Sequence, residues 1–404
     1  MLKNSITPRE TLFKIIKEKH FLLKQILIER QIRCYMIFVR ETSAMKDPAI
    51  DLLVGGDIVW EAAFIFSIDR EGNYRKLAII GNFDADSEKE KGIWDEVVPY
   101  DEGISSELKK EIEKIDPKEI AINFSLENYM ADGITHGMFL KLEEYLPNIK
   151  FISANPIVSS IRGRKTTTEL QLIKKAAEIT EDINNYMTKQ MKIGMTETEI
   201  QNKFHAKMDE LEVGESWQRS GCPASDVGPE KIMGHVGPSE LKARKGHSFH
   251  NDFGIRYQGY CSDLQRMWFF GSEDEIPEEL IHAYDTVHGA ITRAFNFIKP
   301  GVKGWEVDKI ARDYVNERGY KEFMHGLGHQ VGREAHDGGV LLGPSTWAKY
   351  GEAPKGEIEE NNVFTLELHV YTKNYGGVSL EEMIRITKFD AVWIVPRTKN
   401  WICI

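Results

Sequence analysis

Residues 251–263 read NDFGIRYQGYCSD, a pattern that predicts two short strands joined by a turn. Gly254 and Gly259 interrupt its apolar and aromatic residues, so Asp252 and Asp263 are expected on adjacent strands. Asp is disfavoured in strands because its side chain competes with the backbone for hydrogen bonds. Either acid alone would be interpreted as a solvated surface residue, but the pair at this spacing favours a bound cation.

A second segment, residues 324–336, reads MHGLGHQVGREAH and places three histidines among three glycines. Glycine lets the backbone and an imidazole ring approach a site closely. A lone histidine is more often a core residue with satisfied hydrogen bonds, whereas three in one glycine-rich loop favour a functional site.

Two later strand-like runs, residues 363–371 and 377–387, carry Glu367 and Glu381 among apolar neighbours. A buried carboxylate must be protonated, paired or bound to a metal. Four carboxylates and one imidazole form an oxygen-rich set of ligands. Such a set suits two divalent ions better than a closed structural zinc.

The first part of the chain alternates between helical and strand-like patterns, which is typical of an α/β domain. Apolar residues recur at helical spacing over 7–30, and further helices are expected at 106–115 and 138–145. A capping-box pattern at Thr166–Glu169 opens a long helix, so a domain boundary is expected near residue 160. The strands are expected at 33–39, 62–68, 76–80 and 119–123.

The C-terminal part contains a faint internal repeat, in which residues 192–200 resemble residues 299–307. Each copy ends a helix, turns at a glycine and begins another helix that carries an acid at the same offset. Chance similarity between helix joints is one interpretation. Two copies of one unit, which would create a cleft between related halves, is the other.

Composition excludes several classes of function. The 404 residues carry a net charge of −11 that is spread along the chain, which argues against a nucleic-acid or anionic-membrane partner. Four scattered cysteines indicate neither a disulfide framework nor a thiolate zinc site. The N-terminal residues lack a signal-peptide core and no apolar run reaches bilayer length, so a cytoplasmic protein is expected.

Together these motifs resemble the creatinase, prolidase and methionine aminopeptidase superfamily of pita-bread fold, specifically its aminopeptidase P and Xaa-Pro dipeptidase branch. The resemblance covers essentially the whole chain and implies an α/β (α+β) protein. Residues 1–160 would form a creatinase/prolidase-like N-terminal domain, and residues 161–404 the pita-bread catalytic domain. The positions that match the family's five metal ligands, in order, are Asp252, Asp263, His329, Glu367 and Glu381.

The resemblance also implies a mechanism and its cofactors. Two divalent ions, with manganese expected and cobalt, iron or zinc as alternatives, would share a water that is deprotonated at neutral pH and attacks a peptide bond to proline. Glu367 would carry the proton to the leaving nitrogen. His336 and His235 match histidines that contact the scissile group and the substrate, whereas His325 is expected to be structural. The substrate would be a small peptide, and relatives suggest a homodimer.

Several positions near the motifs depart from the peptidase pattern. Leu368 and His369 replace Pro and Gly after Glu367, Ser379 replaces an Arg, and Gln265 replaces a Thr. His369 should lie on the same strand face as Glu367, where it is either a substrate contact or a partly solvated residue. Losing the arginine removes a cation suited to a carboxylate.

Three functions therefore remain open. The first is an Xaa-Pro aminopeptidase or dipeptidase. The second is an amidohydrolase of the same fold that acts on a small amide, resembling a creatinase or an ectoine hydrolase. The third is a catalytically silent binding protein, against which the retention of all five ligand types argues.

Overall fold

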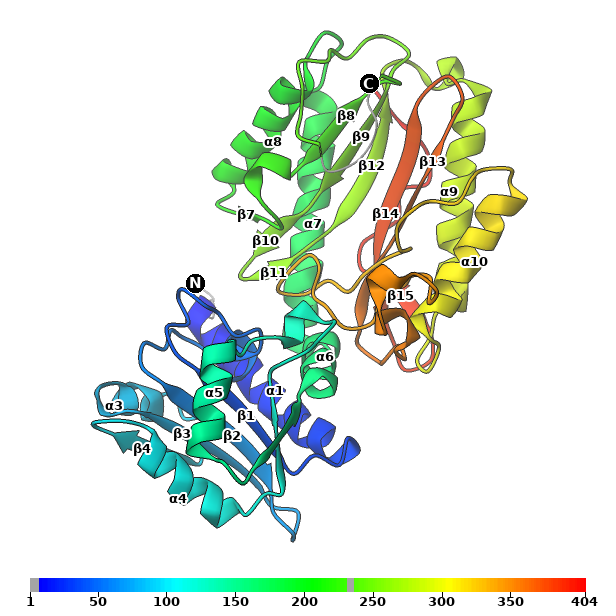
Figure 1. The fold of residues 1–404 in the computed structure, drawn as a ribbon. Helices are drawn as coiled ribbons and strands as arrows, with labels where there is room; N and C mark the ends of the chain where they lie inside the picture. Colours follow the sequence, from blue (N-terminus) through cyan, green and yellow to red (C-terminus); the bar gives the residue numbers. More distant parts are fainter. Residues whose placement is uncertain (1–6, 231–235) are drawn as a thin grey trace. The chain divides into compact units, whose positions relative to one another are not determined.

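The computed structural model describes residues 7–230 and 236–404 (Figure 1). The chain divides into two compact units, Met1–Arg162 and Gly163–Ile404. Both units combine helices with β-sheets, so the predicted α/β class is confirmed.

The first unit is built on a six-stranded mixed sheet in the order β4-β3-β2-β1-β5-β6. The strands β1, β2 and β3 are antiparallel neighbours, whereas β4, β5 and β6 each join in parallel. The four strands expected from the sequence all form within three residues of their predicted ends. The strands are β1 (Cys34–Val39), β2 (Ala62–Ile68), β3 (Tyr74–Gly81), β4 (Glu96–Tyr100), β5 (Glu119–Ile122) and β6 (Lys150–Ser153).

Helices cover both faces of this sheet. Every residue of β1 is buried, because its alternate side chains enter two separate apolar clusters. Helices α1 and α6 contribute to one cluster, and α4 and α5 contribute to the other. The helices are α1 (Pro8–Glu29), α2 (Ile50–Leu53), α3 (Asn82–Glu90), α4 (Ser105–Ile115), α5 (His136–Tyr145) and α6 (Asn155–Gly163).

The second unit is built on a larger sheet whose main path runs β13-β14-β12-β9-β8, and all pairs along this path are antiparallel (Figure 1). Two short strands extend it, since β15 pairs with β14 and β16 pairs with β12. A separate three-stranded sheet has the order β11-β10-β7. The strands are β7 (Gly214–Glu215), β8 (Ala224–Val227), β9 (Ser248–Phe253), β10 (Ile255–Tyr257), β11 (Tyr260–Cys261), β12 (Leu264–Phe269), β13 (Val363–Tyr371), β14 (Gly377–Ile386), β15 (Ala391–Trp393) and β16 (Ile402–Cys403).

Four long helices accompany the larger sheet. Helix α9 packs against β13 and β14, while α8 packs against β8. Thr166 caps α7 through the predicted capping box with Glu169. Tyr186 on this helix is exposed, whereas the next residue, Met187, is buried. The helices are α7 (Thr167–Gln190), α8 (Glu197–Glu210), α9 (Glu278–Phe297) and α10 (Gly304–Glu317).

The predicted strand pair around residues 251–263 forms with one additional break. Asp252 lies on β9 and Asp263 directly precedes β12, the antiparallel neighbour of β9. Gly254 separates β9 from β10, and a Cβ atom there would lie 2.0 Å from the Ser262 carbonyl oxygen. Gly259, with a φ of +83°, turns the chain between β10 and β11. The two acids are thus brought to neighbouring strands.

The two joints of the internal repeat have the same local structure. Gly194 and Gly301 both adopt positive φ, and each is followed by a helix whose first turn closes a capping box with an acid, Glu199 in α8 and Glu306 in α10. The similarity of the two segments therefore extends to their backbone conformation.

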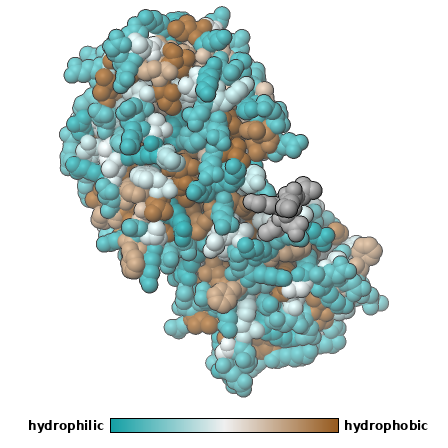
Figure 2. Space-filling model, turned by 180° about the vertical axis from the view of Figure 1, so that it is seen from behind, coloured by the Kyte–Doolittle hydropathy of each residue, from teal (hydrophilic) through white to brown (hydrophobic). Residues whose placement is uncertain are grey.

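The face drawn in Figure 2 is mainly hydrophilic, with hydrophobic residues interspersed among the polar ones. Within the described ranges, none of the helices combines the length and the apolar character needed to cross a bilayer.

Candidate metal centre

Strand register aligns three of the five candidate ligands in one row of the larger sheet. Gln265 on β12 lies opposite Asp252 on β9 and opposite Glu381 on β14. Glu381 in turn lies opposite Glu367 on β13. Side chains that are directly paired in a sheet point to the same face. The row therefore gathers three carboxylates around the amide of Gln265.

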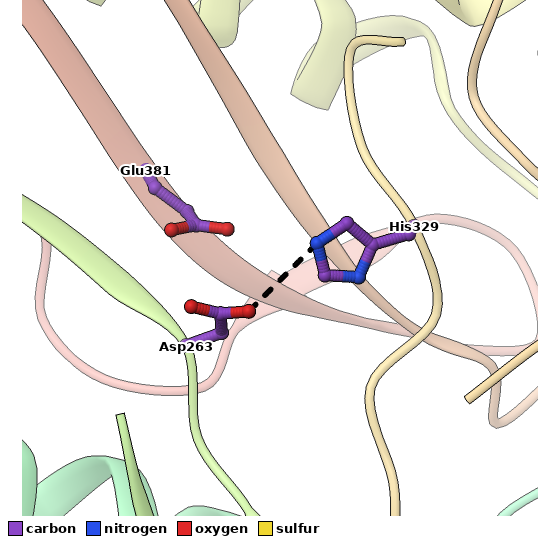
Figure 3. Close-up of side chains that lie close together, drawn as sticks. All are labelled: Asp263, His329 and Glu381. Atoms are coloured by element: carbon purple, nitrogen blue, oxygen red, sulfur yellow. Dashed lines mark ion pairs between the residues drawn. The ribbon is translucent and has the colours of Figure 1, made fainter. Parts of the chain in front are cut away.

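The remaining two candidates complete the cluster. Asp263, His329 and Glu381 each offer a ligand atom, and these atoms all lie within 4.8 Å of one another. Figure 3 shows the three side chains pointing toward one another. The Nε2 atom of His329 lies 3.8 Å from Oδ2 of Asp263 and 3.3 Å from Oε1 of Glu367. The fold thus brings these four side chains together.

Two oxygens of the cluster fit a cation. Oδ1 of Asp252 and Oε2 of Glu381 are buried, and no hydrogen-bond donor reaches them from the part of the chain that the structure describes. Leaving a buried carboxylate oxygen without a partner is costly, and a divalent ion would satisfy it. The donor set of carboxylates with one imidazole fits divalent metals that accept oxygen and nitrogen ligands.

The pKa values of the carboxylates in the cluster also favour a bound cation. Burial raises the pKa of Asp252 to about 7. Burial, together with the neighbouring carboxylates, raises the pKa values of Asp263 and Glu381 well above their usual range. Burial also acts on Glu367, but the hydrogen bond and charge of His329 outweigh it and lower the pKa of Glu367 to about 2. Without a cation, burial therefore favours the protonated forms of Asp252, Asp263 and Glu381, whereas Glu367 stays ionised.

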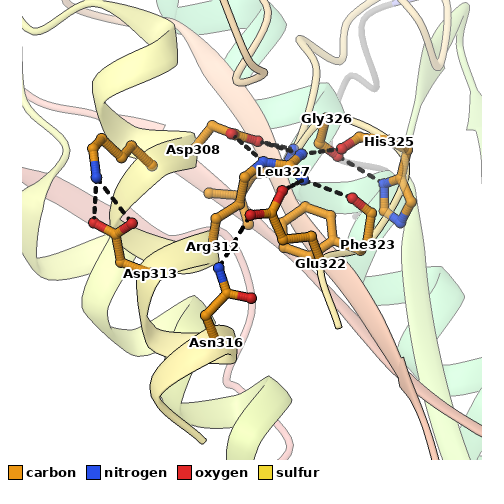
Figure 4. A network of polar contacts seen from close by, with 10 residues as sticks. Asp308, Arg312, Asp313, Asn316, Glu322, Phe323, His325, Gly326 and Leu327 are labelled. Atoms are coloured by element: carbon orange, nitrogen blue, oxygen red, sulfur yellow. Dashed lines mark hydrogen bonds and ion pairs between the residues drawn. The ribbon is translucent and has the colours of Figure 1, made fainter. Parts of the chain in front are cut away.

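Helix α10 holds the beginning of the histidine-rich loop (Figure 4). Asp308 forms a two-pronged ion pair with Arg312 and accepts a 3.0 Å hydrogen bond from the backbone N–H of Leu327. Arg312 donates in turn to the carbonyl oxygens of Phe323 and His325. Both charged side chains are buried, so this ion pair fixes the loop two residues before His329.

The structure describes His336 but not His235. His336 is exposed, and its ring meets that of His329 edge-on, with centroids 4.2 Å apart and an interplanar angle of 76°. The next residue, Asp337, forms a buried 2.8 Å ion pair with Lys165, which anchors the loop behind His336. His235 lies outside the described residues, so its predicted role stays a prediction.

His369 lies opposite Ser379 in the same register that pairs Glu367 with Glu381, which places it on the predicted face of β13. Its Nδ1 atom lies 3.1 Å from Nε2 of His325, and the two rings stack. Burial, followed by the nearby His325, lowers the pKa of His369 to about 4. His369 is therefore neutral at pH 7, and one of its nitrogens is engaged by another histidine.

Sequence reasoning missed two polar residues beside the cluster. His250 on β9 and Asp226 on β8 are buried, and Nδ1 of His250 lies 2.9 Å from Oδ2 of Asp226. The Nε2 atom of His250 lies 3.0 Å from Oε1 of Gln265. The signal was present, because His250 precedes Asp252 by two residues and must share its strand face.

Comparisons with known proteins show what the chain is similar to. The family described as "Metallopeptidase family M24" matches residues 171–388. A Pyrococcus horikoshii protein named Xaa-Pro dipeptidase is 31% identical over 275 residues, which cover 65% of this chain and 72% of that protein. A Mycoplasma pneumoniae protein, provisionally named an Xaa-Pro aminopeptidase, is 31% identical over 241 residues, which cover 59% of this chain and 64% of that protein. The chain thus aligns with less than two thirds of the length of that relative.

A solved structure shows the same fold over nearly the whole chain. The X-Pro aminopeptidase from Thermotoga maritima MSB8 superposes with a TM-score of 0.71 and is 24% identical, covering 93% of this chain and 99% of that one. The predicted two-domain, pita-bread architecture is thereby confirmed.

Proposed function

Because the chain belongs to metallopeptidase family M24, a family of hydrolases, we propose that it cleaves peptide bonds to proline, as an Xaa-Pro aminopeptidase or dipeptidase. The observation that carries this proposal is the cluster of buried carboxylates around His329, two of whose oxygens lack a donor among the described residues. The names of the relatives supply the substrate class.

We propose two divalent ions as the cofactors, with manganese as the first candidate. Bound ions would polarise the scissile carbonyl and lower the pKa of a water at the site. Asp263 and Glu381, whose pKa values are raised by burial and by neighbouring carboxylates, would gain from the positive charge of bound ions. The full set of proposed ligands is Asp252, Asp263, His329, Glu367 and Glu381.

Glu367 is the proposed proton carrier. Its carboxylate is ionised at neutral pH, so it can accept the proton of the attacking water and pass it to the leaving proline nitrogen. The exposed ring of His336, in contact with His329, is suited to donate a hydrogen bond to the developing oxyanion. His235 is proposed to orient the substrate, and His369 to line its binding site.

A second candidate is hydrolysis of a small non-peptide amide. It is favoured by Ser379, where a peptidase of this branch would have an arginine. The Ser379 hydroxyl is engaged with Gln265 and the Leu368 carbonyl, so a short neutral group replaces the expected planar cation. A substrate without a free carboxylate would not need that cation.

One screen separates the two candidates. The full chain would be stripped of metal, reloaded with Mn²⁺, and assayed against Xaa-Pro peptides, matched Xaa-Ala peptides, and small amides related to creatine or ectoine. Selective cleavage of the proline peptides is expected. Cleavage of a small amide with no cleavage of any proline peptide would overturn the peptidase proposal in favour of the second candidate.

We also propose where the enzyme is located, its oligomeric state and its partners. By family resemblance we expect a cytoplasmic homodimer that acts on small peptides, with neither nucleic acid nor a membrane as a partner.

A further inference from the structure

We infer that Gln265 is a positioning residue that orients Glu367 for metal binding, and that His250, Asp226 and Ser379 hold Gln265 in the required orientation. This inference rests on the proposed function, because it assigns a role toward the proposed metal centre. None of these four residues belongs to the proposed ligand set.

Both the nitrogen and the oxygen of the Gln265 amide make hydrogen bonds. Its Nε2 atom donates a 3.0 Å hydrogen bond to Oε2 of Glu367. Its Oε1 atom accepts from the Ser379 hydroxyl at 2.5 Å and faces Nε2 of His250 at 3.0 Å. Turning the amide over would place its oxygen against the Glu367 carboxylate, where two acceptors repel each other. The orientation of Gln265 is therefore set on both sides.

The imidazole of His250 is fixed in the same way. One ring nitrogen faces Gln265 and the other faces Asp226, so neither rotation nor a ring flip preserves both contacts. Gln265, His250 and Asp226 are all at least 93% buried, with exposed fractions of 7%, 7% and 4%. Water therefore cannot readily replace a lost partner, and the chain of contacts acts as a rigid support.

The contacts of Gln265 and His329 determine which carboxylate oxygen of Glu367 is available to bind a metal ion. Oε2 is occupied by the Gln265 amide, whereas Oε1 lies 3.3 Å from Nε2 of His329. Glu367 is thus directed to bind a cation through Oε1, next to the imidazole ligand. Partners of metal ligands in other proteins change metal affinity by roughly 10- to 100-fold when they are removed.

Metal binding by the full chain tests this assignment without any assay of activity. Mn²⁺ affinity would be measured by titration calorimetry, and the visible absorption of bound Co²⁺ would report the arrangement of the ligands. We expect Gln265→Ala to weaken Mn²⁺ binding about 10-fold or more and to change the Co²⁺ spectrum. Adding His250→Ala to Gln265→Ala should cause little further loss, because His250 acts through Gln265.

Gln201→Ala is the matched control. Gln201 is also a buried glutamine of the second unit, but its amide donates to the backbone carbonyls of Ser220 and Pro223. Thermal unfolding would establish that each variant is folded, and Ser379→Ala gives a milder second probe if Gln265→Ala is unstable. Mn²⁺ affinity and Co²⁺ spectra that match Gln201→Ala would overturn the inference.

The two proposals fail separately. If the unmodified chain binds Mn²⁺ tightly yet cleaves no proline peptide, the proposed function fails while the role of Gln265 stands or falls on the titrations. If it binds no divalent ion at all, both are overturned.

Discussion

Glu367 and Glu381 lie directly opposite each other on the antiparallel strands β13 and β14. Two ionised carboxylates in directly paired positions would destabilise a sheet, and the charge of Glu367 is one reason that the pKa of Glu381 is raised; both side chains are also largely removed from water. A divalent cation between the strands would reverse the sign of this interaction. The energetic cost of the metal-free site and the affinity of the loaded site therefore have the same origin.

Metal binding should stabilise the second unit. Any ligand that binds only the folded state raises the free energy of unfolding, by about 2.7 kcal/mol at 100 times its dissociation constant. We expect Mn²⁺ to raise the unfolding temperature of the EDTA-treated chain in scanning calorimetry. Glu381→Gln should abolish most of this shift, and an equal shift in that variant would contradict the assignment of Glu381.

The metal-free chain should lose stability as the pH rises. Burial raises the pKa of Asp252 to about 7 from its ordinary value of 3.8, so the folded state binds more protons than the unfolded state between these values. The stability that Asp252 contributes is complete below pH 4 and is lost as the pH rises through 7. Urea unfolding in EDTA at pH 5 and pH 7.5 measures this loss.

The comparison with Asp252→Asn isolates this effect from other titrating groups. The variant should gain stability relative to the unmodified chain on going from pH 5 to pH 7.5. A stability difference that stays constant over this interval would show that Asp252 does not titrate there.

Replacing Glu367 with Gln should slow catalysis while leaving much of the site in place. General acid–base groups contribute about 10²- to 10⁴-fold to turnover, so a loss of that size is expected for Glu367→Gln. Metal content must be measured alongside the rate, so that a lost ion is not mistaken for a lost proton carrier. Near-normal turnover with metal retained would end this assignment.

Breaking the buried ion pair between Asp308 and Arg312 should destabilise the second unit, because this pair holds the histidine-rich loop. Asp308→Asn leaves Arg312 without its carboxylate in a buried position, which costs about 3–5 kcal/mol in comparable cases. Denaturant unfolding measures the loss. The matched control is Lys309→Ala, which breaks an exposed pair with Asp313 on the same helix and should cost under about 1 kcal/mol. Equal losses in the two variants would contradict the proposed support.

Local patterns predicted much of the fold. The strand expected at 62–68 forms with those ends, because its mostly apolar run contains the β-favouring residues Phe64–Phe66 and Ile68 and is followed by polar turn residues. The capping box at Thr166 likewise marks the start of α7. Each of these features depends on a few adjacent residues, which is why the sequence alone reveals it.

The contacts of the site could not be predicted in the same way. That Gln265 lies opposite both Asp252 and Glu381 depends on the register of three strands far apart in the sequence. The ion pair of Asp226 with His250 depends on a fourth strand. Motif spacing suggested which residues carry the chemistry, whereas the strand pairing determines which residues support them.

We propose that two divalent ions are held together by Asp252, Asp263, His329, Glu367 and Glu381. The most direct measurement is anomalous X-ray diffraction at the manganese edge from crystals of the full chain grown with Mn²⁺. Two anomalous peaks are expected among these five side chains. The absence of any peak at the cluster, with the protein saturated in Mn²⁺, would contradict it.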